Sequence, residues 1–91
     1  MEKQNILIVE DEIITALDIQ MRLKKHGYST VDYVTTGEEA ITMIKDQNVD
    51  LVLMDIKLKG VMDGISTAKL IIKKYSIPII YISGNTDKHM L

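Results

Sequence analysis

Three short runs of consecutive apolar residues constrain the fold of this chain more than any other feature. They lie at residues 6–9, 51–54 and 79–82, and each is four residues long. Runs of this length without polar alternation are typical of strands buried on both faces of a parallel sheet. A polar residue follows each run directly, namely Glu10, Asp55 and Ser83. We therefore predict strands at 6–9, 51–55 and 79–83, each delivering a polar side chain to its carboxyl end.

A helix and a fourth strand are predicted between the first two runs. Helical spacing extends from residue 13 to about 25 and is carried by Ile13, Leu17 and Met21, flanked by Ala16 and Leu23. Gly27 supplies the stop, because glycine readily adopts the left-handed conformation that ends helices. Residues 29–35 are rich in Thr, Val and Tyr with partial alternation, which predicts a half-exposed strand at the edge of the sheet.

Two further helices are predicted before and after the strand at 51–55. The sequence Thr-Gly-Glu-Glu at 36–39 has capping-box spacing and opens a short helix. One face of that helix consists of Ala40, Ile41 and Ile44. After a loop at 56–63, a third helix is expected to be capped by Asp63. Its helical spacing is carried by Ile65, Ala68, Ile72 and Tyr75.

Strands and helices therefore alternate along the chain, with short connections between them. This order implies right-handed crossovers and an α/β fold in which helices cover both faces of a parallel sheet. The length of 91 residues allows one small domain, and the hydrophobic content of 46% is enough for a core. We treat residues 1–91 as a single domain.

Composition excludes several classes of function. The absence of cysteine rules out disulfide frameworks and thiol-based redox or zinc sites. A net charge of −2, with acids and bases scattered, leaves no basic surface for direct binding of nucleic acid or of an anionic membrane. No apolar run approaches the roughly 18 to 20 residues of a membrane-spanning helix, and the N-terminus lacks a signal-peptide pattern. We expect a soluble, cytoplasmic protein.

The polar residues at the strand ends predict the chemistry. Parallel strands present their carboxyl ends at one edge of the sheet, so Glu10, Asp11, Asp55 and Ser83 should meet there. Carboxylates held close together repel one another unless a cation neutralises them, and Mg²⁺ prefers such oxygen ligands. With an ion present, an Asp carboxylate can attack a phosphoryl group to give an acyl phosphate. The Ser83 hydroxyl and the Gly84 N–H are candidate donors to that group.

Four motifs together resemble the receiver domain of two-component response regulators, of which the chemotaxis response regulator is the simplest relative. They are Ile-Leu-Ile-Val-Glu-Asp-Glu at 6–12, Leu-Val-Leu-Met-Asp at 51–55, Met-Asp-Gly at 62–64 and Pro-Ile-Ile-Tyr-Ile-Ser-Gly at 78–84. The resemblance implies a flavodoxin-like, doubly wound sheet. It also implies that Asp55 accepts phosphate from the phosphohistidine of a histidine kinase, and that the domain then switches conformation to control an output partner. Such a domain is a signalling switch and not a turnover enzyme.

The resemblance also assigns roles to individual residues. Asp11 and Asp55 would bind Mg²⁺ or Mn²⁺ directly, together with the backbone carbonyl of Lys57, while Glu10 would act mostly through water. Ser83 would be the hydroxyl that moves to the phosphoryl group, and the backbone of Gly84 would contact that group. In the loop after Asp55, the usual Met-Pro of the family is replaced by Leu-Lys at 58–59.

Two other functions stay open for this chain. Receivers usually have five strands, and this sequence stops just after the fourth. We therefore expect the strand order 2-1-3-4. The fifth strand, the last two helices and the lysine that bridges to the phosphoryl group in the family would be absent. An inert or adaptor fragment is therefore one alternative, and the uncovered strand at 79–83 could form a homodimer or a swapped oligomer. A small Mg²⁺-dependent phosphatase-like hydrolase is another, although such enzymes usually carry a second Asp where Lys57 stands.

Overall fold

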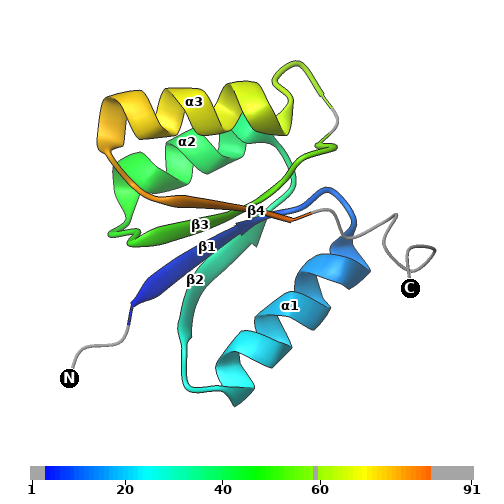
Figure 1. Cartoon of the computed structure of the whole chain (residues 1–91). Helices are drawn as coiled ribbons and strands as arrows, with labels where there is room; N and C mark the ends of the chain where they lie inside the picture. Colours follow the sequence, from blue (N-terminus) through cyan, green and yellow to red (C-terminus); the bar gives the residue numbers. More distant parts are fainter. Residues whose placement is uncertain (1–3, 59, 83–91) are drawn as a thin grey trace.

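The computed structural model describes residues 4–58 and 60–82, and these residues form alternating strands and helices (Figure 1). In chain order the elements are β1 (Asn5–Val9), α1 (Ile13–Lys25), β2 (Ser29–Val34), α2 (Gly37–Asp46), β3 (Leu51–Asp55), α3 (Gly64–Tyr75) and β4 (Ile79–Ile82). The predicted alternation is confirmed. Ser83 and Gly84 lie outside the described residues. Within the described ranges, no helix combines the length and the apolar character needed to cross a bilayer.

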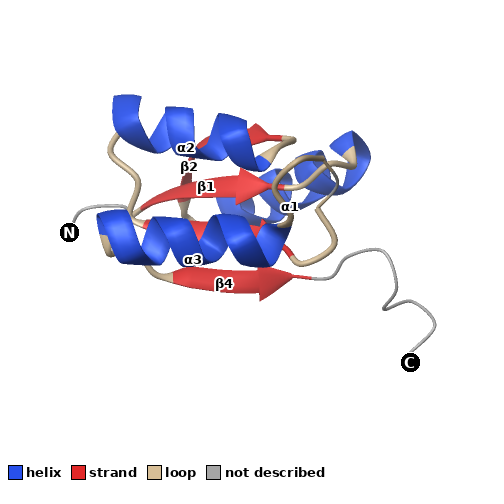
Figure 2. Ribbon diagram, turned by 90° about the horizontal axis from the view of Figure 1, so that it is seen from above, coloured by secondary structure: helices blue, strands red, loops and turns tan. Residues whose placement is uncertain are grey.

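All four strands run parallel in the order β2-β1-β3-β4, which confirms the predicted topology. The strand β2 lies at an edge, as its mixed composition indicated. The start of β1 is tied to the start of β3, because the Asn5 N–H donates to Asp50 Oδ2 at 2.8 Å and the Asp50 N–H donates to the Asn5 carbonyl at 2.8 Å. Helices α2 and α3 cover one face of the sheet and α1 covers the other (Figures 1 and 2).

The apolar strands supply both halves of the core. Successive residues of a strand point to opposite faces, so β1 divides its side chains between the two layers. Leu7 and Val9 join the cluster beneath α2 and α3, whereas Ile6 and Ile8 join the cluster with Ala16 of α1. Because β1 and β3 are covered on both faces, no position along them needs to be polar, which explains why these runs are continuous.

The predicted helix ends are confirmed. The Thr36 side chain accepts a hydrogen bond from the Glu39 N–H at 3.1 Å and caps α2. The Asp63 carboxylate accepts from the Ser66 N–H at 2.7 Å and caps α3. Beyond α1, Gly27 has a φ of +89° and donates its N–H to the Lys24 carbonyl. Only glycine takes this left-handed conformation at little cost, so Gly27 turns the chain toward β2.

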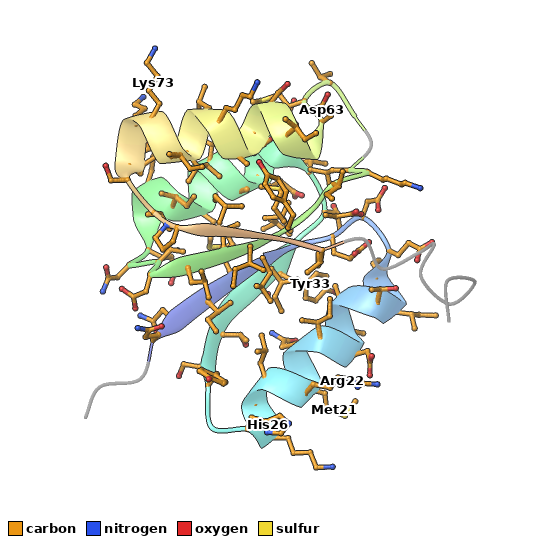
Figure 3. The ribbon with its side chains drawn as sticks, viewed as in Figure 1. Met21, Arg22, His26, Tyr33, Asp63 and Lys73 are labelled. Carbon is orange, nitrogen blue, oxygen red and sulfur yellow. The ribbon has the colours of Figure 1, made fainter. Side chains whose placement is uncertain are left out.

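The buried face of α1 differs from the stripe that marked it in the sequence. Leu17 and Met21 are 45% and 65% exposed, and Met21 lies on the side of α1 away from the sheet (Figure 3). The residues that pack on the sheet are Ala16, fully buried, with Ile19 and Leu23. Among the described residues no second helix covers this face of the sheet beside α1 (Figure 1). The outer apolar stripe of α1 is therefore left in contact with water.

The buried face of α3 is also shifted from the predicted stripe. Ile65 and Ile72 are 46% and 50% exposed, although Ala68 is buried as expected. The buried side chains of α3 include Thr67 and Ile71. Thr67 is tolerated there because its hydroxyl donates to the Asp63 carbonyl at 2.7 Å. Hydrophobicity alone favours Ile72 over Thr67, whereas the helix packs through the face that carries Thr67, Ala68 and Ile71.

Adjacent isoleucines of α3 provide a matched test of this face. We expect Ile71→Ala to cost about 2 to 5 kcal/mol of unfolding free energy, because it leaves a cavity at a fully buried position. Ile72→Ala, the same change at a half-exposed position, should cost less than about 1 kcal/mol. Urea denaturation of both variants measures the difference. Equal losses of unfolding free energy, or a larger loss for Ile72→Ala, would indicate that Ile72 packs on the sheet, as the sequence predicted.

Candidate functional site at the carboxyl ends of the strands

Strand register brings Glu10 and Asp55 side by side. Val9 of β1 is the register partner of Met54 of β3. Glu10 directly follows β1, and Asp55 is the last residue of β3. The backbone is held at this level on both sides of the pair. The Glu10 N–H donates to the Val34 carbonyl at 3.0 Å, and the Ile56 N–H donates to the Ile82 carbonyl at 2.9 Å. The two carboxylates therefore stand on a fixed part of the sheet.

Three acidic side chains converge at this edge. One carboxylate oxygen from each of Glu10, Asp11 and Asp55 lies within 4.8 Å of the others. Glu10 is 1% exposed and Asp55 is 2% exposed, while Asp11 is half-buried. The structure thus places together the three acids that the sequence predicted to meet.

In each buried acid, one carboxylate oxygen accepts a backbone hydrogen bond and the other has no hydrogen-bond partner. The Lys57 N–H donates to Asp55 Oδ1 at 2.9 Å, and the Glu12 N–H donates to Glu10 Oε2 at 3.1 Å. When both carboxyls are ionised, Glu10 Oε1 and Asp55 Oδ2 are buried without a hydrogen-bond partner within the described part of the chain. A buried oxygen of this kind costs free energy unless a partner is supplied. Two such oxygens beside Asp11 form the hard, anionic donor set that suits Mg²⁺.

The electrostatics of Glu10 support the same conclusion. Burial raises the pKa of its carboxyl from 4.5 to about 7, and the charge of Asp55 adds to this rise, although the hydrogen bond from the Glu12 N–H opposes it. Glu10 therefore holds its proton into the neutral range when no cation is near. A bound cation would favour the ionised form, because metal binding to acidic ligands releases protons.

The loop after Asp55 is fastened to the core. Leu58 is 4% exposed and belongs to the cluster beneath α2 and α3. It stands where the family usually has Met, so one apolar side chain replaces another there. Gly64, the first residue of α3, packs against the Asp55 backbone. Neither contact was predicted from the sequence, because no local pattern reveals a contact across a loop.

The other predicted site residues have different outcomes. Lys57 contributes its backbone N–H to Asp55, and its carbonyl as a metal ligand stays a prediction. Ser83 and Gly84 lie outside the described residues, so their roles stay predictions as well. Glu12 was not predicted to belong to the site; it takes the N-cap position of α1, and its carboxylate accepts from the Thr15 hydroxyl at 3.2 Å.

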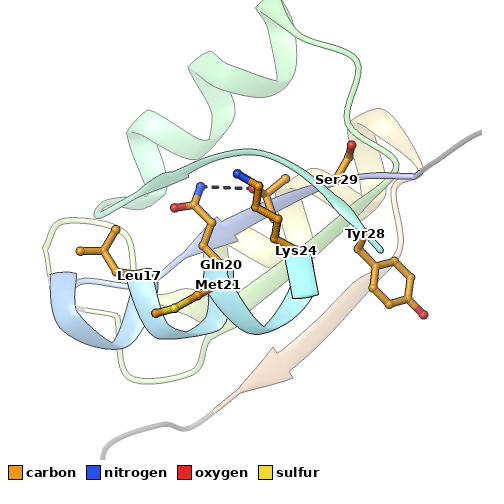
Figure 4. Close-up of a pocket in the computed structure, with 7 residues that line it drawn as sticks. Leu17, Gln20, Met21, Lys24, Tyr28 and Ser29 are labelled. Carbon is orange, nitrogen blue, oxygen red and sulfur yellow. Dashed lines mark hydrogen bonds between the residues drawn. The ribbon is translucent and has the colours of Figure 1, made fainter. Parts of the chain in front are cut away.

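An open groove of about 730 Å³ lies elsewhere, between α1 and the start of β2 (Figure 4). It is lined by Leu17, Gln20, Met21, Lys24, Tyr28, Ser29 and Thr30. Gln20 spans from α1 to β2 by donating to the Thr30 hydroxyl at 3.2 Å. The groove contains none of the clustered acids, so its size does not bear on the chemistry at the strand ends.

The raised pKa of Glu10 predicts a pH-dependent stability without metal. An unfolded chain releases this proton near pH 4.5, whereas the folded state keeps it to about pH 7. The folded state binds more protons in this window, so the contribution of Glu10 to stability falls as pH rises. We expect Glu10→Gln to gain about 3 kcal/mol of unfolding free energy relative to the parent between pH 4.5 and pH 8.

Urea denaturation in a chelating buffer at several pH values measures this difference. In excess Mg²⁺ at pH 8 the order should reverse, with the parent more stable than Glu10→Gln, because the ion favours the carboxylate. Parallel pH profiles for the two proteins in chelator would show that Glu10 ionises normally in the folded state.

Comparison with known proteins gives the family. Residues 6–91 match the response regulator receiver domain. The chain is similar to the transcriptional regulatory protein PdtaR of Mycobacterium tuberculosis, with 31% identity over 88 residues that cover 97% of this chain and 42% of PdtaR. It is also similar to the transcriptional regulatory protein YvrH of Bacillus subtilis, with 34% identity covering 96% of this chain and 36% of YvrH. The chain thus spans less than half the length of these relatives.

Solved structures agree with this result. The signal receiver domain of a modulated diguanylate cyclase from Desulfovibrio desulfuricans G20 superimposes with a TM-score of 0.86 at 33% identity. The match covers 96% of this chain and 70% of that chain. The sheet order, the acids at the strand ends and the family match over residues 6–91 lead to one conclusion. This chain belongs to the family of response regulator receiver domains of two-component systems.

Proposed function

We propose that this chain accepts a phosphoryl group on Asp55 from the phosphohistidine of a histidine kinase, in a reaction that depends on Mg²⁺ or Mn²⁺. The observation that carries the proposal is the pair of bare, buried oxygens on Glu10 and Asp55 beside Asp11. In a receiver fold this pair lies at the edge where ligands of parallel α/β sheets bind. A signalling role also suits the family, whose members act as switches.

Several residues of the chain have separate roles in phosphoryl transfer. The Lys57 N–H holds Asp55 Oδ1, and this bond fixes the plane of the carboxylate and the direction of Oδ2. An Asp55 oxygen attacks phosphorus as the bond from phosphorus to the kinase imidazole breaks, and the imidazole leaves with the electron pair of that bond. Asp11, Asp55 and the Lys57 carbonyl would hold the ion, and its charge would help to neutralise the phosphoryl oxygens.

Phosphorylation would then shift the population between two conformations that differ in affinity for an output partner. The Ser83 hydroxyl and the Gly84 N–H would contact the new phosphoryl group. The similar proteins differ in what they regulate, since two are named transcriptional regulators and one is a diguanylate cyclase. We therefore propose an output protein or domain without assigning its chemistry. The net charge of −2 argues against direct contact with nucleic acid or membranes.

A small phosphodonor tests the proposal directly. Incubation with acetyl phosphate and Mg²⁺ should add one phosphoryl group, detected by intact-mass spectrometry, and Asp55→Asn should lose the adduct because an amide is a poor nucleophile. Chelation of Mg²⁺ should also abolish it. Steady release of inorganic phosphate without an accumulating adduct would favour a phosphatase-like hydrolase. Absence of both adduct and release would indicate an inert receiver.

We further propose that β4 pairs with a second copy of the chain. The Val52 and Ile56 N–H groups donate to the carbonyls of Pro78 and Ile82, so Ile79 and Tyr81 direct their own polar groups to the other side of β4. Among the described residues no strand pairs with that side. Ile80 and Tyr81 are also 51% and 42% exposed. Uncovered apolar edges of this kind favour pairing between chains.

Substitution at Tyr81 tests this pairing. Tyr81→Pro removes an N–H from the outer side of β4 and leaves the bonds to β3 in place. Tyr81→Lys instead places a charge on the same edge. Light scattering at increasing concentration should show oligomers for the parent and monomers for both variants. A parent that stays monomeric, or variants that associate equally well, would contradict the proposal.

A further inference from the structure

The first residue of α3 lies directly against the backbone of Asp55. A Cβ at Gly64 would overlap the Asp55 carbonyl oxygen and would lie 3.0 Å from the carbonyl carbon and 3.2 Å from the Ile56 carbonyl oxygen. Gly64 is buried, and its φ is not in the left-handed region, unlike those of Gly27 and Gly60. Glycine is therefore required here for space and not for backbone conformation.

The start of α3 is held firmly from its other sides. The Thr67 hydroxyl donates to the Asp63 carbonyl at 2.7 Å, and the Asp63 carboxylate accepts from the Ser66 N–H at 2.7 Å. Thr67 in turn faces Gly37 at the start of α2, where a Cβ would overlap the Thr67 hydroxyl oxygen. The overlap at Gly37 would fall on the hydroxyl at the end of one side chain, whereas the overlap at Gly64 would fall on backbone atoms of Asp55.

The Asp55 backbone is held by β4 and α3 more than by β1. The register between β1 and β3 ends at Val9 and Met54, so Asp55 has no register partner on β1. Within the described ranges, the contacts that position Asp55 include the pairing with Ile82 of β4, the hydrogen bond from the Lys57 N–H and the start of α3. Displacement of the Asp55 carbonyl would rotate its peptide and move the carboxylate with it.

We propose that Gly64 is a positioning residue for the acidic site. By letting α3 begin against the Asp55 carbonyl, Gly64 sets where the Asp55 carboxylate stands relative to Glu10 and Asp11. This inference rests on the proposed function, in which the three acids hold a divalent ion. Mg²⁺ and similar ions demand ligand distances accurate to about 0.2 Å, so a small displacement of one ligand weakens binding.

Two glycines at equivalent places allow a matched experiment. Gly64→Ala and Gly37→Ala both add one methyl group at the first residue of a helix, and both create an overlap. Only Gly64 contacts the backbone of Asp55. Mn²⁺ affinity measured by titration calorimetry should fall at least tenfold in Gly64→Ala and stay within about twofold of the parent in Gly37→Ala. Urea denaturation of both variants reports how much stability each overlap removes.

The outcomes separate this inference from the proposed function. Mn²⁺ affinity within twofold of the parent in Gly64→Ala would overturn it, and so would equal weakening in both variants, which would reflect general destabilisation. A parent protein that does not bind Mn²⁺ would refute the metal site, and the positioning role would fall with it. A parent that binds Mn²⁺ but forms no Asp55 adduct would refute only the phosphoacceptor proposal.

A second pair of variants keeps the test decisive if Gly64→Ala fails to fold. Asp63→Asn removes the charge but keeps an N-cap, because Asn caps helices as well as Asp does. Asp63→Ala removes both and loosens the first turn of α3 without adding atoms near Asp55. We expect Mn²⁺ to bind about threefold more weakly to Asp63→Ala than to Asp63→Asn. Equal affinities would show that the start of α3 does not position the site.

Discussion

The crowding of carboxylates at a dry edge of the sheet is the constraint on which the rest of this structure depends. Glu10 and Asp55 are almost fully buried, and each leaves one oxygen without a partner among the described residues. Burial of an unpaired polar oxygen costs a few kcal/mol, which is a large part of the roughly 5 to 15 kcal/mol that stabilises an ordinary domain. The fold offsets this cost elsewhere, through two apolar clusters and well-capped helices. The acidic site lowers the stability of the fold, and a bound cation at that site would restore it.

Much of the fold was predictable because its signals are local. The continuous runs in β1 and β3 indicate burial on both faces, and Thr36, Asp63 and Gly27 mark helix ends through contacts within a few residues. The buried faces of α1 and α3 were less predictable. Which stripe of an apolar helix meets the sheet depends on what else covers the sheet. Leu17 and Ile72 are left about half exposed, whereas Thr67 occupies a buried position that hydrophobicity alone assigns to solvent.

The candidate site was predictable in its members and not in its details. Glu10, Asp11 and Asp55 follow parallel strands, and a parallel sheet brings such residues to one edge whatever the loops do. In Glu10 and Asp55, the backbone N–H two residues further on binds one carboxylate oxygen and leaves the other without a partner. Loop geometry sets the directions of these N–H groups, so the sequence alone does not reveal them. The contact of Gly64 with Asp55 crosses the loop at 56–63, and only the folded chain reveals it.

The pairing of β1 with β3 has a consequence for how the domain comes into being. Asn5 and Asp50, which tie these strands together, are 45 residues apart in the sequence. In a chain emerging from the ribosome, β1 can pair with β2 early, but Glu10 and Asp11 do not meet Asp55 until β3 has been made. The burial of Glu10 and the acidic site arise in the same late step, when long-range contacts close. A divalent ion that binds only the closed site would add about 2.7 kcal/mol to folded-state stability at a concentration one hundred times its dissociation constant. Such an ion would then govern the completion of folding as well as the chemistry at Asp55.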